Sequence, residues 1–92
     1  MLKRDEIEDS SSCFNKARDD ERMFVMLARD PAAPVAIRAW VAERIKIEKN
    51  AANDPQILEA IDCAKRMEIE RAEMEAQRRQ QKIQFAESAV AP

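Results

Sequence analysis

The chain of 92 residues contains no glycine and no histidine, and aromatic residues make up only 4% of it. Glycine enters left-handed turns, β-bulges and phosphate-binding loops more easily than any other residue. Its absence argues against a sheet protein and against a glycine-rich nucleotide loop. Without histidine, Cys13 and Cys63 cannot complete a usual zinc site within one chain. We therefore expect no bound metal and no cofactor.

Long apolar runs are also missing. No stretch approaches the roughly 20 apolar residues of a membrane helix, and residues 1–10 carry several acids and no apolar run, so we expect no secretory signal. We expect a cytosolic protein in which Cys13 and Cys63 stay reduced, with a disulfide between them as the alternative. The net charge of −2, from 16 basic and 18 acidic residues, gives no overall field toward nucleic acid or an anionic membrane.

Residues that favour helices are abundant, namely alanine, glutamate, arginine, lysine, glutamine and methionine. We expect an all-α fold of three or four helices with a long C-terminal helix. Residues 1–9 are expected to form a flexible arm, residues 10–86 a single helical domain and residues 87–92 a disordered tail. A domain this short buries only a small core, so a partner or a second copy is expected to reinforce it.

Serines and prolines predict where the first helices begin. The serines at 10–12 offer an N-cap for a helix beginning at Cys13. A second helical segment is expected from about Asp20, with one apolar face made of Met23, Phe24, Leu27 and Ala28. Prolines at 31 and 34 predict a turn, followed by a helix from about Pro34 to Lys49.

The last helix is expected to begin at Pro55, with Asp54 as its cap. Its first three turns carry an apolar stripe made of Ile57, Leu58, Ile61, Ala64 and Met67. Beyond this stripe we expect a solvated extension, held by i, i+4 ion pairs such as Glu75 with Arg79. Arginines 71 and 78 occupy core positions of the heptad pattern, so self-association through this helix is left open.

Trp40 allows two interpretations. In the first it is the centre of the core, and its helix packs between residues 14–27 and the start of the last helix. In the second it forms an exposed docking surface with neighbouring soft apolar side chains, Met23, Phe24, Met26 and Ile37.

A polar cluster lies among the apolar residues of positions 10–40. Its lysine offers a point charge, its asparagine a two-way hydrogen-bonding edge, and its acids can accept from an amine, a ribose or an arginine. The candidate ligand- or partner-binding residues are Asn15, Lys16, Arg18, Asp20, Glu21, Arg38 and Trp40. The alternative is a solvated turn with intrahelical ion pairs such as Lys16 with Asp20.

Nothing in the sequence indicates catalysis, so we expect a protein that is not an enzyme. Cys13 has no histidine to activate it, and no spacing places two carboxylates across a cleft. The acids at 19–21 diverge by about 100° each on a helix, and this suits a helix N-terminus better than a divalent cation. The basic residues of the last helix alternate with glutamates, so nucleic acid is not an expected partner.

The order of residues between positions 13 and 40 resembles a group of short, uncharacterised helical proteins of tailed phages and prophages. The resemblance is carried by Cys13, Asn15-Lys16-Ala17, Asp20-Glu21, Phe24-Val25, Ala28, Asp30, Ala33-Pro34, Ile37 and Trp40. It implies an accessory protein made by a phage in the host bacterial cytoplasm. Such proteins are often inhibitors that bind a host protein, commonly one of defence, and some instead take up a nucleotide signal.

Three functions remain after these arguments. The first is a homo-oligomeric, non-enzymatic accessory protein that docks on a host protein, such as a defence protein, and inhibits it. The second is an oligomeric sponge that sequesters a small nucleotide-like ligand. The third is a helical structural or assembly factor that uses the long last helix.

Overall fold

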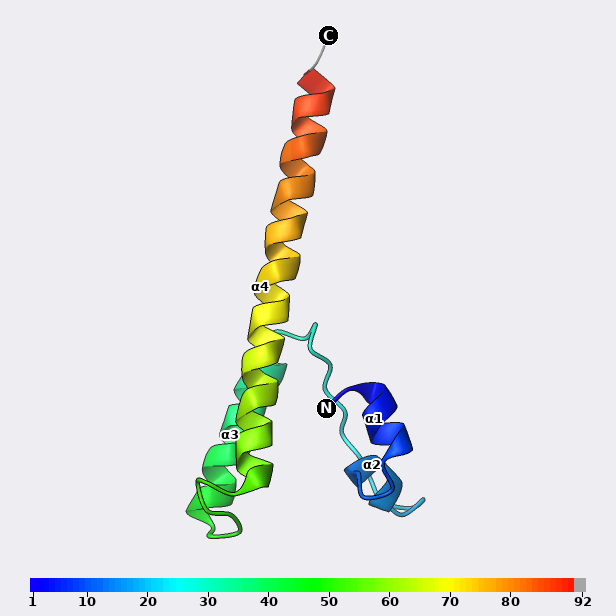
Figure 1. The fold of residues 1–92 in the computed structure, drawn as a ribbon, viewed down its shortest axis with the longest axis vertical. Coiled ribbons are helices and arrows are strands. Elements are labelled where there is room, and N and C mark those ends of the chain that lie inside the picture. Colours follow the sequence, from blue (N-terminus) through cyan, green and yellow to red (C-terminus); the bar gives the residue numbers. More distant parts are fainter. Residues whose placement is uncertain (91–92) are drawn as a thin grey trace.

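The computed structural model describes residues 1–90, and in this part of the chain it contains helices and no strand. The helices are α1 (Lys3–Glu8), α2 (Cys13–Lys16), α3 (Ala33–Lys46) and α4 (Pro55–Val90). Figure 1 shows α4 as a rod that runs the length of the molecule, with α3 beside its first half and α1 and α2 set apart from both. The expected all-α fold with a long C-terminal helix is confirmed.

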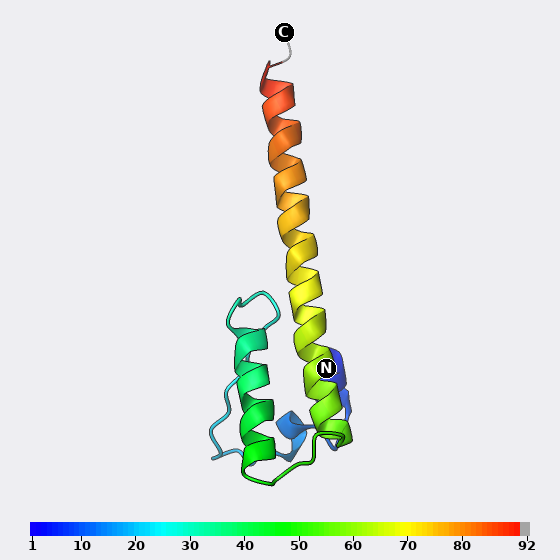
Figure 2. The ribbon, with the colours of Figure 1, turned by 90° about the vertical axis from the view of Figure 1, so that its left-hand side faces the viewer.

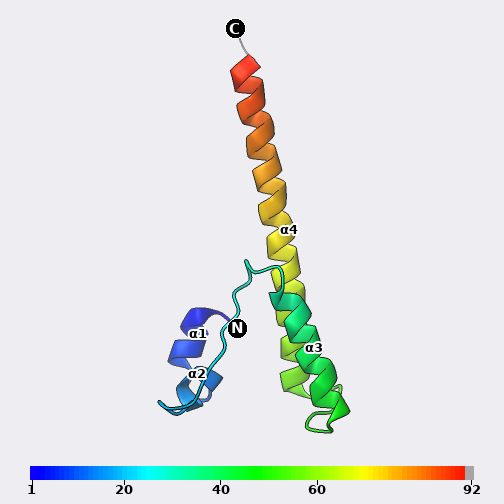
Figure 3. The ribbon, with the colours of Figure 1, turned by 180° about the vertical axis from the view of Figure 1, so that it is seen from behind.

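Helices α3 and α4 pack together as an antiparallel hairpin, seen from behind in Figure 3. The buried residues of this hairpin are Ala33, Pro34, Val41, Ile57 and Ala64. Alanine has no side chain beyond Cβ, so the fully buried alanines let the two helices approach closely. Across the hairpin, Nη2 of Arg38 lies 2.6 Å from Oε1 of Glu68.

The turn that ends α3 is made without glycine. The N–H of Lys49 donates to the carbonyl of Arg44, and the N–H of Glu48 donates to the carbonyl of Ile45, both at 3.0 Å. These are the two hydrogen bonds of a Schellman motif. Glu48 occupies its left-handed position with φ 60°, where a Cβ is crowded. The helix therefore ends at Lys46, slightly earlier than expected.

The loop that leads into α4 is held by side chains. Nε of Arg44 donates to Oδ1 of Asn50 (2.6 Å), and Nδ2 of Asn50 donates to Oδ2 of Asp54 (3.1 Å). The same carboxylate oxygen accepts from the N–H of Ala51 (2.9 Å). Helix α4 begins at Pro55, as expected.

Helices α1 and α2 form a small N-terminal unit, residues 3–17, that packs against neither α3 nor α4. Ser12 is buried, and its Oγ accepts from the N–H of Asn15 (3.2 Å) and donates to the carbonyl of Glu6 (2.6 Å). The N-cap before Cys13 is thus confirmed, although α2 is only one turn long. Residues 1–9, which were expected to form a flexible arm, contain α1.

The prediction of a second helix from about Asp20 is wrong. Residues 22–27 form an extended segment that runs between the N-terminal unit and the hairpin, along one margin of the molecule (Figure 2). Five consecutive apolar residues, 23–27, fit a short strand as well as a helix. A helix confined between Asp20 and Pro31 is also too short to be stable by itself. The apolar face assigned to this segment therefore does not exist.

Trp40 is not the centre of the core. Its side chain is 40% exposed, whereas Ile57 and Ala64 are 0% exposed. The helix around Trp40 packs on α4 as expected, but α2, at the start of the expected region 14–27, does not pack on α3. From the rest of that region, Met26 lies beside Ile37 and Trp40. The core lies wholly within the α3–α4 hairpin.

The molecule is elongated, with extents of 64 × 29 × 19 Å and a radius of gyration of 18.5 Å. A compact chain of this length has a radius of gyration of roughly 12 Å. Helix α4 continues to Val90 through most of the expected tail, and residues 91–92 lie outside the described residues. Among residues 1–90, no helix combines the length and the apolar character needed to span a membrane.

Candidate functional site

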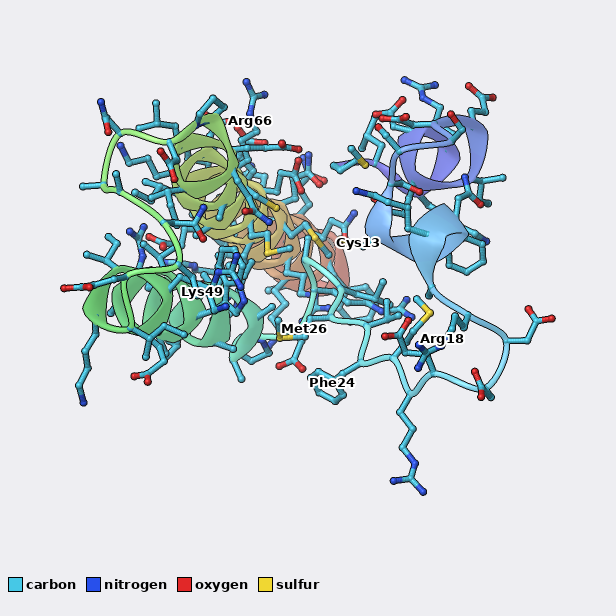
Figure 4. All side chains as sticks on the ribbon, turned by 90° about the horizontal axis from the view of Figure 1, so that it is seen from below. Cys13, Arg18, Phe24, Met26, Lys49 and Arg66 are labelled. Carbon is cyan, nitrogen blue, oxygen red and sulfur yellow. The ribbon has the colours of Figure 1, made fainter. Side chains whose placement is uncertain are left out.

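A groove of about 580 Å³ lies between the N-terminal unit and the α3–α4 hairpin. The N-terminal side contributes Glu6, Asp9, Cys13 and Lys16, among others. The opposite wall includes Met26, Ile37, Trp40, Glu59 and Cys63. Figure 4 shows Met26 directed toward α3, and Cys13 on the side of α2 that faces α4. The groove thus has an apolar floor with charged groups at its edges.

Trp40 is held at the groove by Arg44. The guanidinium carbon of Arg44 lies 5.3 Å from the centroid of the indole ring. This distance is within the range of a cation–π interaction. The same guanidinium donates to Asn50, so the loop before α4 fixes Arg44 in turn. One face of the indole is therefore covered, and the 40% exposed part of the side chain remains free to contact a partner.

Acidic groups dominate the charge at the N-terminal edge. Asp9 accepts from the hydroxyl of Ser11 (2.7 Å) and from the N–H of Ser11 (2.8 Å). These hydrogen bonds, with the hydroxyl as the main cause, hold the pKa of Asp9 below its usual value. Glu6 also lines the groove, and its carboxylate accepts from the N–H of Phe14 (3.0 Å). Lys16 and the amino group of Met1 are basic groups that line the groove.

Asn15 has a structural role through its amide nitrogen. Its Nδ2 lies within hydrogen-bonding distance of three backbone carbonyls at the end of α1: Glu6 (3.1 Å), Ile7 (2.8 Å) and Asp9 (2.8 Å). These carbonyls have no partner inside so short a helix. The amide nitrogen therefore joins α2 to the end of α1 and has no hydrogen left for a ligand.

The other candidate residues do not converge. Arg38 is paired with Glu68 on α4. Arg18 lies 3.4 Å from Asp20 in an exposed loop, and Oε1 of Glu21 accepts from the N–H of Arg18 (3.2 Å). These contacts correspond to the alternative of a solvated turn, without the expected pair between Lys16 and Asp20. Of the seven candidates, the lining of the groove includes Lys16 and Trp40.

Sequence reasoning missed Cys63 and Glu59 as lining residues. Both lie on α4, on the helix face next to the stripe that packs on α3. Their shared position on that face is the one signal in the sequence that could have indicated a second surface. Cys13 and Cys63 are both free thiols that line the groove. The amino group of Met1 lies 3.8 Å from Sγ of Cys63. The N-terminus thus contacts α4 across the groove.

Within residues 1–90, no group of three or more histidine, cysteine, aspartate or glutamate side chains is placed to hold a metal ion. What the groove offers instead is apolar contact, a half-exposed tryptophan and a mainly acidic edge. Comparison of the chain with protein-family models, with curated proteins and with solved structures finds no match.

Proposed function

We propose that the protein is a non-enzymatic accessory protein of phage type that docks on a host bacterial protein, such as a defence protein, and inhibits it. The docking surface is the groove, with Trp40 as its anchor. The phage context comes from the sequence resemblance, and the place of action is the host bacterial cytoplasm.

The observation that carries this proposal is the state of Trp40. Tryptophan and arginine are the residues most often found at the energetic centre of protein–protein interfaces. Here a 40% exposed tryptophan stands beside an arginine at the wall of an apolar groove. The methionines that line the same groove adapt their shape to a partner at low cost.

The charge at the groove favours one kind of partner surface. Glu6 and Asp9 stand at the N-terminal edge and Glu59 at the α4 edge, against the positive charges of Lys16 and of the Met1 amino group. An apolar side chain flanked by lysine or arginine matches this arrangement, because opposite charges at the rim guide association and orient the partner. We therefore expect the docked element to carry a net positive charge.

Site-specific cross-linking tests the location of the docking surface. A photoreactive residue at position 59, on the α4 edge of the groove, should capture one host protein, and the same residue at position 85, on the distal part of α4, should not. The captured protein is then purified, and its affinity for the unmodified chain is measured by calorimetry.

Trp40→Ala should weaken binding to that purified protein by about 30-fold or more, the effect of truncating a central interface residue. Phe85→Ala is the matched control, because Phe85 is a 77% exposed aromatic residue outside the groove. Circular dichroism monitors the fold of both variants. A Trp40→Ala variant with normal helicity and unchanged affinity would contradict the proposal.

A further inference from the structure

The backbone of the extended segment, residues 22–27, lacks partners. Within the described chain, no hydrogen bond uses an N–H or carbonyl group of residues 22–26. The carbonyl of Leu27 accepts only from Asp30, in the turn before α3. A row of free N–H and carbonyl groups is a template on which another strand can pair.

Two side chains of this segment also lack cover, whereas Met26 is half-buried and residues 23–27 line a hollow of about 570 Å³ beside the N-terminal unit. Phe24 is 87% exposed and Val25 68%, and Figure 4 shows Phe24 pointing away from the helices. Side chains alternate along an extended chain, so residues 23, 25 and 27 share one face and residues 24 and 26 share the other. All five are apolar, and both faces of the segment therefore suit burial. A strand that is apolar on both faces is typical of a covered sheet.

The whole chain exposes more surface than a folded monomer of its mass. Its accessible area is 8028 Å², whereas a compact monomer of 10.6 kDa exposes roughly 5,500 Å². The excess is larger than the area of about 800 Å² that each partner buries in a standard interface. The excess is spread over the whole elongated molecule, and the exposed apolar side chains of residues 22–27 contribute to it.

We propose that residues 22–27 pair with the same residues of a second copy and form an antiparallel two-stranded ribbon on a twofold axis. Such an axis is perpendicular to the ribbon, so a given residue points to the same face of the ribbon in both copies. Residues that lie directly opposite each other also point to the same face. The central residue of one copy must therefore lie opposite the same residue of the other copy. The entire apolar run 23–27 pairs with the same run of the second copy only when Val25 is this central residue. The same register brings Glu21 of each copy to the end of the segment where Arg29 of the other copy lies.

This arrangement pairs about half of the backbone groups that a single copy leaves free, namely those on the edge that faces the second copy. The ribbon forms roughly four to six backbone hydrogen bonds between the copies. Glu21 and Arg29, which flank the segment, add complementary charge at both ends and favour this register, although Arg29 lies in the turn after the segment. The pairing uses the backbone of residues 22–27 and does not use Trp40, although the side chain of Met26 lines the groove.

A disulfide across the axis tests the register. Val25→Cys, made with Cys13→Ala and Cys63→Ala, should form a covalent dimer on mild oxidation, because directly opposed Cα atoms lie about 4.5–5.5 Å apart. The matched control is Val35→Cys in the same background, since Val35 on α3 is 69% exposed, against 68% for Val25. The control should stay monomeric on a denaturing gel. Equal cross-linking of the two variants would overturn the proposal.

A charge placed on the axis tests the interface without covalent chemistry. Val25→Asp sets two carboxylates against each other and should raise the dimer dissociation constant by at least about tenfold, with unchanged helicity. Val35→Asp should leave it unchanged. The readout is molar mass by light scattering over a concentration series. A chain that is monomeric at its highest soluble concentration, or a Val25→Asp variant that dimerises as well as the unmodified chain, would refute the ribbon.

Discussion

Glu48 occupies a backbone conformation that costs a residue with a Cβ about 1–2 kcal/mol. It does so because the chain has no glycine to close α3. Glu48→Gly should therefore stabilise the protein by about 0.5–1 kcal/mol, measured as the free energy of unfolding in urea. Glu43→Gly, inside the same helix, is the opposite-sign control and should destabilise by about 1 kcal/mol. Loss of stability in both variants would show that the turn is not left-handed at residue 48.

Ser11 lowers the pKa of Asp9, mainly through its hydroxyl. Because the folded-state pKa lies below the unfolded value of 3.8, the hydrogen bonds stabilise the N-terminal unit above that pH. This contribution is lost as the pH falls through the lower, folded-state pKa. Ser11→Ala should raise the pKa of Asp9 toward its ordinary value, as followed by NMR titration of the carboxyl carbon. Ser10→Ala is the matched control and should leave the Asp9 titration where it is.

Helices α1 and α2 owe their association to polar contacts, chiefly through Asn15. Asn15→Ala removes all three contacts between its amide and the carbonyls of α1. We expect hydrogen exchange to quicken throughout residues 3–17, because the freed carbonyls must turn to water. Exchange in α3 and in the first half of α4 should stay unchanged, since the N-terminal unit does not pack on them. Faster exchange in both parts would mean that they unfold as one unit.

Sequence patterns predicted elements well where the signal is local. Ser12 before α2 and Pro55 at the start of α4 act on their own neighbours, and both boundaries were found. The prediction of a helix over residues 22–27 failed because an unbroken apolar run shows neither the helical nor the strand periodicity. The ion pair expected between Glu75 and Arg79 is replaced by Arg71 with Glu75 at 3.3 Å, since several partners lie within reach on one face. The groove is lined by residues between positions 1 and 63, and a local sequence pattern cannot predict contacts between residues so far apart in the chain.

At the scale of the molecule, the buried residues of α4, Ile57 and Ala64, lie in its first half. The residues that the hairpin buries all precede position 72. A chain that ends after Arg79 should therefore keep its melting temperature within a few degrees, while its helical ellipticity falls with the lost turns. The ribbon dimer should survive this truncation, as measured by light scattering. Loss of the dimer would favour the assembly factor, because only that function requires the extension for self-association.

The length of α4 also determines how the protein moves through water. The molecule is more than three times as long as it is thin, at 64 Å against 19 Å. A rod experiences more friction than a sphere of equal mass, and it turns end over end far more slowly than it spins about its axis. One copy should therefore elute from gel filtration ahead of compact proteins of 10.6 kDa and sediment more slowly than they do.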